Sequence, residues 1–65
     1  MEILTWQART EKNLTLYQLA ELTGISKSAL NNIENGKTSP TLRQLEAIAK
    51  ALNVPMTDLF DSDYK

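Results

Sequence analysis

Apolar residues recur at steps of three and four along almost the whole chain, and no segment alternates apolar and polar positions as a half-exposed strand does. This spacing predicts helices and no sheet. The two glycines and two prolines fall between the periodic segments, where helices end and turns begin. The pattern therefore predicts an all-α fold, a compact bundle of five short helices.

Several helix ends carry recognisable signals. Thr15 and Ser26 fit the N-caps of the second and third helices, because a hydroxyl group accepts a hydrogen bond from the free amides of a first turn. Gly24 suits the left-handed backbone that often ends a helix. Ser39 or Thr41 caps the fourth helix. The first three predicted helices span residues 2 or 3 to 12, 16 to 22 and 27 to 35. The fourth runs from its cap at residue 39 or 41 to residue 52, and a short last turn contains residues 56 to 60.

The apolar sides of these segments define one predicted core. We expect a single domain over residues 1–60 and a polar tail over 61–65 that frays. Trp6 is interpreted as a packing residue. The other residues predicted to face the core are Leu4, Ala8, Leu16, Leu19, Ala20, Ile25, Leu30, Ile33, Leu42, Leu45, Ile48, Ala49 and Leu52, with Met56, Leu59 and Phe60 partly in it.

Composition narrows the possible functions. The chain has no cysteine and no histidine, so it lacks disulfides, thiolate metal ligands and the commonest general base. It has no paired carboxylates in a rigid setting and no phosphate-binding glycine loop, so we expect no catalytic residues, no metal, no cofactor and no enzyme activity. Neither a membrane span nor a signal peptide is recognisable, which favours a cytoplasmic protein.

The charge balance argues against a nucleic-acid binder, because the net charge is −1 and such proteins are normally basic. The distribution of charge changes this picture. Three aspartates lie in the last eight residues, whereas the stretch from Ser26 to Lys50 holds four cations and two acids. A local patch decides binding more than the total charge does. The sequence therefore allows a nucleic-acid partner but predicts modest nonspecific affinity.

A very short connection joins the second and third predicted helices, which is the helix-turn-helix arrangement. Ala20 is small where the two helices approach, and Gly24 permits the sharp turn. The outer side of the third helix carries side chains that contribute little to a core and can all form hydrogen bonds: Lys27, Ser28, Asn31 and Asn32. Such a row suits base edges and phosphates, although composition alone would also fit a simple solvated face.

The stretch from Leu14 to Ser26, continued by Ile33-Glu34-Asn35-Gly36-Lys37 to Pro40, resembles the phage-repressor and Cro-like, or XRE-type, helix-turn-helix family. The segments 48–54 and 58–60 are similar to the fourth and fifth helices of that family, so the likeness covers about residues 4–60. It implies a lambda-repressor-like DNA-binding domain. It also implies a sequence-specific transcriptional regulator, a repressor, that reads the major groove of double-stranded DNA with the third helix.

The resemblance implies roles for individual residues. Lys27, Ser28, Asn31 and Asn32 would contact bases, with lysine favouring guanine and asparagine favouring adenine. The residues that would contact the DNA backbone are Thr15, Leu16, Tyr17, Ser26, Asn35, Lys37, Thr38 and Arg43. Arg9 and Glu34 would form a structural ion pair. Leu16 departs from the family, which often has glutamine there, so one polar contact to DNA is missing.

The resemblance further implies a weak homodimer on a pseudo-palindromic operator. An alternative function is an antitoxin or a phage or mobile-element control factor that acts mainly through a protein partner. The acidic balance and the apolar segment from Met56 to Phe60 motivate this alternative, because surplus apolar surface marks protein contacts.

Overall fold

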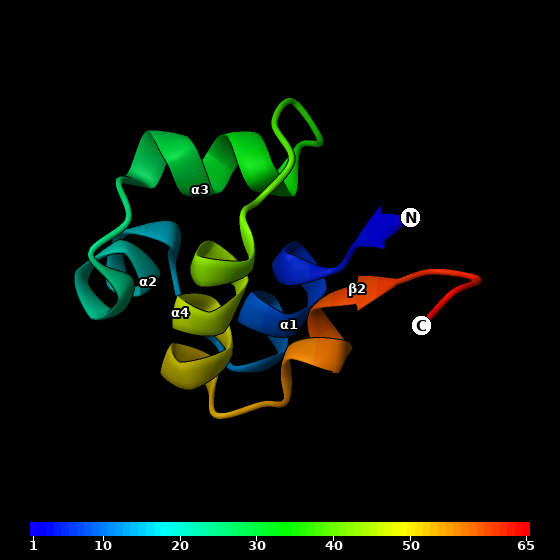
Figure 1. Cartoon of the computed structure of the whole chain (residues 1–65). Coiled ribbons are helices and arrows are strands. Elements are labelled where there is room, and N and C mark those ends of the chain that lie inside the picture. The colour runs from blue at the N-terminus through cyan, green and yellow to red at the C-terminus, as the bar shows by residue number, and fades with distance from the viewer.

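The computed structural model describes all 65 residues and contains four α-helices. These are α1 (Thr5–Glu11), α2 (Leu16–Thr23), α3 (Lys27–Glu34) and α4 (Leu42–Leu52). Helix α3 lies across the top of the molecule, α2 lies at its left, and α4 and α1 lie side by side below α3 (Figure 1). None of the helices is long and apolar enough to cross a membrane.

The two ends of the chain meet in a short antiparallel pair of strands. Strand β1 (Glu2–Ile3) pairs with β2 (Phe60–Asp61), with Glu2 opposite Asp61 and Ile3 opposite Phe60. Both chain ends project from the same side of the molecule (Figure 1). Asp61, placed in the polar tail by the sequence, therefore belongs to a strand, and fraying of the last residues stays a prediction.

The expected bundle of five short helices is wrong in two places. The fifth segment is a single 3-10 turn, η1 (Met56–Leu59), which lacks a side-chain cap and gives way to an extended backbone at Phe60. Residues 2 and 3 form β1 instead of opening the first helix. The Leu4 N–H donates to the Leu59 carbonyl at 2.8 Å, so the chain before α1 is held to the C-terminal segment. The all-α helix-turn-helix class still describes the fold.

The predicted helix caps are confirmed. The Thr15 hydroxyl accepts from the Gln18 N–H at 3.0 Å, and the Gln18 side chain accepts in return from the Thr15 N–H at 2.9 Å. The same reciprocal pair joins Thr41 and Gln44, so Thr41 is the cap of α4. Ser26 caps α3 by accepting from the Ala29 N–H. Gly24 has φ of 74°, the left-handed conformation that glycine adopts without strain.

The core gathers apolar side chains from all four helices and from η1. Its buried members are Ala8, Leu19, Leu30, Ile33, Leu45, Ile48, Ala49, Leu52 and Leu59. Two predicted members lie outside it, since Trp6 is 52% exposed and Leu42 is 75% exposed. Trp6 follows the buried Thr5, and consecutive helical residues point about 100° apart, so Trp6 faces outward. Leu42 lies in the first turn of α4, ahead of the first buried residue of that helix, Leu45.

Thr5 occupies a core position that an apolar residue would fill better. Its side chain is 1% exposed, and its hydroxyl oxygen has no hydrogen-bond partner. A buried hydroxyl without a partner loses its hydration and gains nothing in return. This residue therefore lowers the stability of the fold.

We expect Thr5→Val to raise the free energy of unfolding by about 1 kcal/mol, because it replaces the hydroxyl with a methyl group of similar size. Urea denaturation followed by circular dichroism measures the change. Thr5→Ala is the control, which also removes the hydroxyl but leaves a void and should lower stability. A less stable Thr5→Val variant would show that the hydroxyl is hydrogen-bonded in solution.

Candidate nucleic-acid interface

Helix α3 lies across one side of the molecule and is covered by the rest of the fold only from below (Figure 1). Leu30 and Ile33 hold it to the core, and their side chains are 1% and 2% exposed. The opposite face of the helix points outward. Lys27, Ser28 and Asn31 are exposed, so the structure brings three of the predicted base-contacting residues together on one outward helix face.

Asn32, the fourth predicted base-contacting residue, differs from the other three because it is half-buried. Its carbonyl accepts from the Lys37 N–H at 2.9 Å and from the Thr38 N–H at 3.4 Å. These bonds fold the following loop back onto the last turn of α3. The left-handed Gly36, with φ of 76°, makes this reversal possible. Asn32 therefore fixes the loop, a role that sequence reasoning missed.

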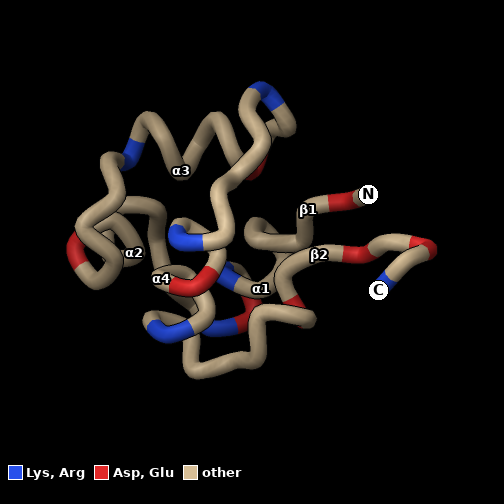
Figure 2. Tube along the Cα trace, viewed as in Figure 1, with Lys and Arg blue, Asp and Glu red and all other residues tan.

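The loop after α3 carries the next group of predicted residues. Asn35, Lys37 and Thr38 are all exposed, and the hydrogen bonds to Asn32 place them beside the end of α3. Positive positions lie at the start of α3 and in this loop, whereas acidic positions lie in both strands and in the segment after β2 (Figure 2). The charge distribution thus separates a mildly positive side along α3 from a negative side at the termini.

The start of α2 offers backbone amides for an anion. The reciprocal cap uses the N–H groups of Thr15 and Gln18, which leaves those of Leu16 and Tyr17 without a partner inside the helix. The Leu16 side chain is half-buried against the core, and Tyr17 is 65% exposed. Leu16 can therefore contribute its amide to a phosphate contact although it lacks the side chain of glutamine.

Two further predicted residues belong to the starts of helices. The Ser26 hydroxyl accepts from the Ala29 N–H at 3.1 Å and keeps its own proton for donation. Arg43 is exposed in the first turn of α4, with no ion pair or hydrogen bond to another residue. Both side chains are free to meet an anion.

Arg9 and Glu34 form a bidentate ion pair that joins α1 to the last turn of α3. The Arg9 Nε donates to the Glu34 Oε2 at 2.7 Å, and Nη2 donates to Oε1 at 3.1 Å. A third bond runs from Nη1 to the Leu14 carbonyl at 2.7 Å. The two side chains are only 11% and 4% exposed. The pair is therefore a structural link, and its carboxylate is satisfied within the protein.

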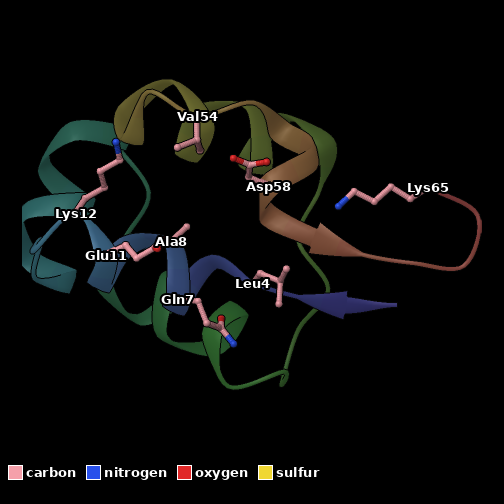
Figure 3. A pocket seen from close by; sticks show the side chains of 8 residues that line it. All are labelled: Leu4, Gln7, Ala8, Glu11, Lys12, Val54, Asp58 and Lys65. Atoms are coloured by element: carbon pink, nitrogen blue, oxygen red, sulfur yellow. The ribbon is translucent and has the colours of Figure 1, made fainter.

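A hollow of about 350 Å³ lies away from α3, between α1, η1 and the C-terminal residue (Figure 3). Leu4, Ala8 and Val54 line it, and charged side chains of both signs surround it, among them Lys12 and Asp58. None of its residues belongs to α2 or α3, so it is separate from the polar face of α3. No group of three acidic, histidine or cysteine side chains that could hold a metal ion occurs in the structure.

Comparison with known proteins places these features among DNA-binding regulators. The helix-turn-helix family matches residues 7–59. The HTH-type transcriptional regulator SutR of Escherichia coli is 45% identical over 51 residues, which cover 78% of this chain and 29% of SutR. The chain thus spans less than a third of that relative's length.

Two solved structures share the fold closely. The restriction-modification controller protein C.AhdI of Aeromonas hydrophila superposes with a TM-score of 0.82 at 30% identity, over 86% of this chain and 85% of that one. The N-terminal DNA-binding domain of SinR from Bacillus subtilis gives a TM-score of 0.81 at 34% identity, over 94% of this chain and 90% of that one.

We expect Glu34→Gln to lower the free energy of unfolding by about 2–4 kcal/mol, because it leaves the Arg9 charge nearly buried without a counter-charge. Chemical denaturation measures the loss. The double variant Arg9→Met/Glu34→Met is the control and should recover at least half of it, since two apolar side chains bury no charge. A Glu34→Gln variant within about 0.5 kcal/mol of the parent would mean that the pair contributes nothing.

Proposed function

The chain belongs to the phage-repressor and Cro-like (XRE-type) helix-turn-helix family, and on this premise we propose that it is a sequence-specific transcriptional regulator of double-stranded DNA. The observation that carries the proposal is the outer side of α3, where Lys27, Ser28 and Asn31 are exposed and no apolar side chain interrupts them. These groups match the hydrogen-bonding edges of bases.

Helix α3 has the right size to enter the major groove. An α-helix with its side chains is about 10–12 Å across, and the groove is about 12 Å wide. Lys27 favours guanine O6 and N7, and the asparagines favour adenine N6 and N7. We assign base contacts to Lys27, Ser28 and Asn31. We also assign to Asn32 a base contact at the inner edge of this row, in addition to its role in holding the loop.

Contacts to phosphates would flank α3 on both sides. The free amides of Leu16 and Tyr17, with the Thr15 cap, suit a phosphate on one side, helped by the positive end of the α2 dipole. Asn35, Lys37 and Thr38 suit another beyond the end of α3. Ser26 and Arg43 would add one contact each. Such contacts position the protein, whereas the side chains on α3 supply the sequence preference.

The partner that this arrangement fits is a pseudo-palindromic operator bound by two copies, each with its α3 in successive major grooves. A protein at such a site excludes other proteins from the same DNA, so we assign a repressor role. We propose a cytoplasmic location, since a transcriptional regulator has to reach the DNA that it binds. The net charge of −1 and the acidic chain ends predict weak binding to unrelated sequences.

The alternative, a control factor that acts mainly through a protein partner, has less support. One of its two grounds, beside the acidic charge balance, is the apolar segment from Met56 to Phe60. In the structure Leu59 is fully buried, and Met56 and Phe60 are half-buried against the core. Most of this apolar surface is therefore used inside the domain and does not call for a partner protein.

A selection from random duplexes at about 50 mM salt tests the function, and we expect a two-fold symmetric motif. Asn31→Ala should cost about tenfold to a hundredfold in affinity and relax one symmetric position of the motif. Lys37→Ala should weaken binding to all DNA sequences alike and make the salt dependence of the affinity shallower by about one phosphate contact per copy.

Lys50→Ala is the matched control, since Lys50 is an exposed cation at the end of α4 that lies farthest from α3 (Figure 1). It should leave affinity and motif unchanged. A steep salt dependence without any motif would mean attraction to the DNA backbone only. Absence of binding to every duplex would refute the proposed function and leave the partner-binding alternative.

A further inference from the structure

Strand β1 has an outer edge that the fold leaves open. Bonded and non-bonded residue pairs alternate along an antiparallel ladder. The Leu4 N–H bonds to the Leu59 carbonyl, and the next pair in the register is Ile3 with Phe60. The N–H and C=O groups of Ile3 and Phe60 therefore point away from each other, toward the two outer edges of the sheet.

The outer edge of β2 is partly covered, because its outward carbonyl is bonded. The Phe60 carbonyl accepts from the Lys65 Nζ at 2.9 Å, and this ammonium group lies 5.5 Å from the centre of the Phe60 ring. The turn that returns Lys65 to this position is closed by the bond from its N–H to the Ser62 carbonyl. No side chain and no turn amide bonds to the backbone of Ile3, so both outward groups of β1 are free, whereas the outward carbonyl of β2 is occupied.

A hollow of about 440 Å³ lies along this free edge. Met1, Glu2 and Ile3 line one side of it. The end of α3 and the loop after it line the other side, through residues 33–36, 38 and 39. An unpaired edge beside an open hollow is a place where an extended segment adds to a sheet.

We propose that a second copy of this chain occupies this edge, with the two β1 strands antiparallel and Ile3 opposite Ile3 of the second copy. This inference rests on the proposed function and names its dimer contact. The register follows from the backbone, because Ile3 is the β1 residue whose N–H and C=O both face outward. A two-fold axis at Ile3 lets each copy donate one bond and accept one, which is the self-complementary contact of symmetric dimers.

The position of β1 agrees with DNA binding by two copies. The strands project from the end of the molecule at which α3 finishes (Figure 1). The molecule is 31 Å in its longest dimension, which is of the same order as the distance of about 34 Å between successive major grooves on one face of DNA. Two backbone hydrogen bonds hold two free chains together only weakly. DNA strengthens the contact, because it holds two copies side by side and so raises their effective concentration.

Disulfide trapping tests the contact, since the chain has no cysteine of its own. Directly opposite residues of an antiparallel pair have Cβ atoms about 4.5–5.5 Å apart, close enough for a disulfide after a small shift. Ile3→Cys should form a covalent dimer at least tenfold faster than Glu21→Cys, an exposed control on α2 at the other end of the molecule. Oxidation is run on the duplex selected with the parent protein and also without DNA at high protein concentration.

A backbone variant gives an independent measurement. Ile3→Pro removes the outward N–H but no bond of the β1–β2 pair, and edge strands tolerate proline. It should bind a single half-site like the parent and the full palindrome about tenfold more weakly. Ile3→Val keeps the N–H and should bind both as the parent does. An equal loss of affinity for a half-site would show that the proline disturbs the single copy. In that case the disulfide-trapping rates decide whether the β1 edges pair.

Equal trapping rates for Ile3→Cys and Glu21→Cys, or an Ile3→Pro variant with undiminished binding to the palindrome, would overturn the proposed contact while leaving DNA binding intact. Failure of the parent to bind any duplex would instead refute the proposed function. In that case the trapping rates without DNA still decide whether the β1 edges pair.

Discussion

The bidentate pair between Arg9 and Glu34 is the contact on which the position of α3 depends. An isolated helix of eight residues is unstable in water, so α3 exists only because the rest of the fold holds it. Its outer side is polar, which leaves two buried apolar side chains, Leu30 and Ile33, as anchors. The ion pair adds a directional anchor at the last turn and reaches Leu14 as well, so α1, α3 and the turn before α2 keep one arrangement.

A directional anchor matters because Leu30 and Ile33 alone would allow α3 to rotate or slide. Apolar contacts are not directional, whereas a bidentate pair fixes the relative position of two planar groups. The carbonyl of Asn32 continues this constraint into the loop by binding the N–H groups of Lys37 and Thr38. The exposed groups of α3 and the loop are thus held as one rigid surface, which reduces the entropy lost when a ligand binds.

Features set by neighbouring residues could be predicted from the sequence. Thr15, Ser26 and Thr41 cap helices through bonds to residues three positions on, and Gly24 turns the chain without strain, so each leaves a local signal. The outward row on α3 follows from helical periodicity. Strand β1 could not be predicted, because two residues are too few to show alternation and their partner lies at the far end of the chain. The exposure of Trp6 and Leu42 likewise depends on where other helices happen to cover α1 and α4.

The pairing of β1 with β2 also bears on how the chain folds. It joins Ile3 to Phe60 and so closes a loop of nearly the full chain, which costs more conformational entropy than the contacts between successive helices. We therefore expect the contacts between successive helices to form first and the terminal pair to form last. By the same reasoning we expect it to open first in the native state, so that backbone amides at the chain ends exchange with solvent while the core stays protected.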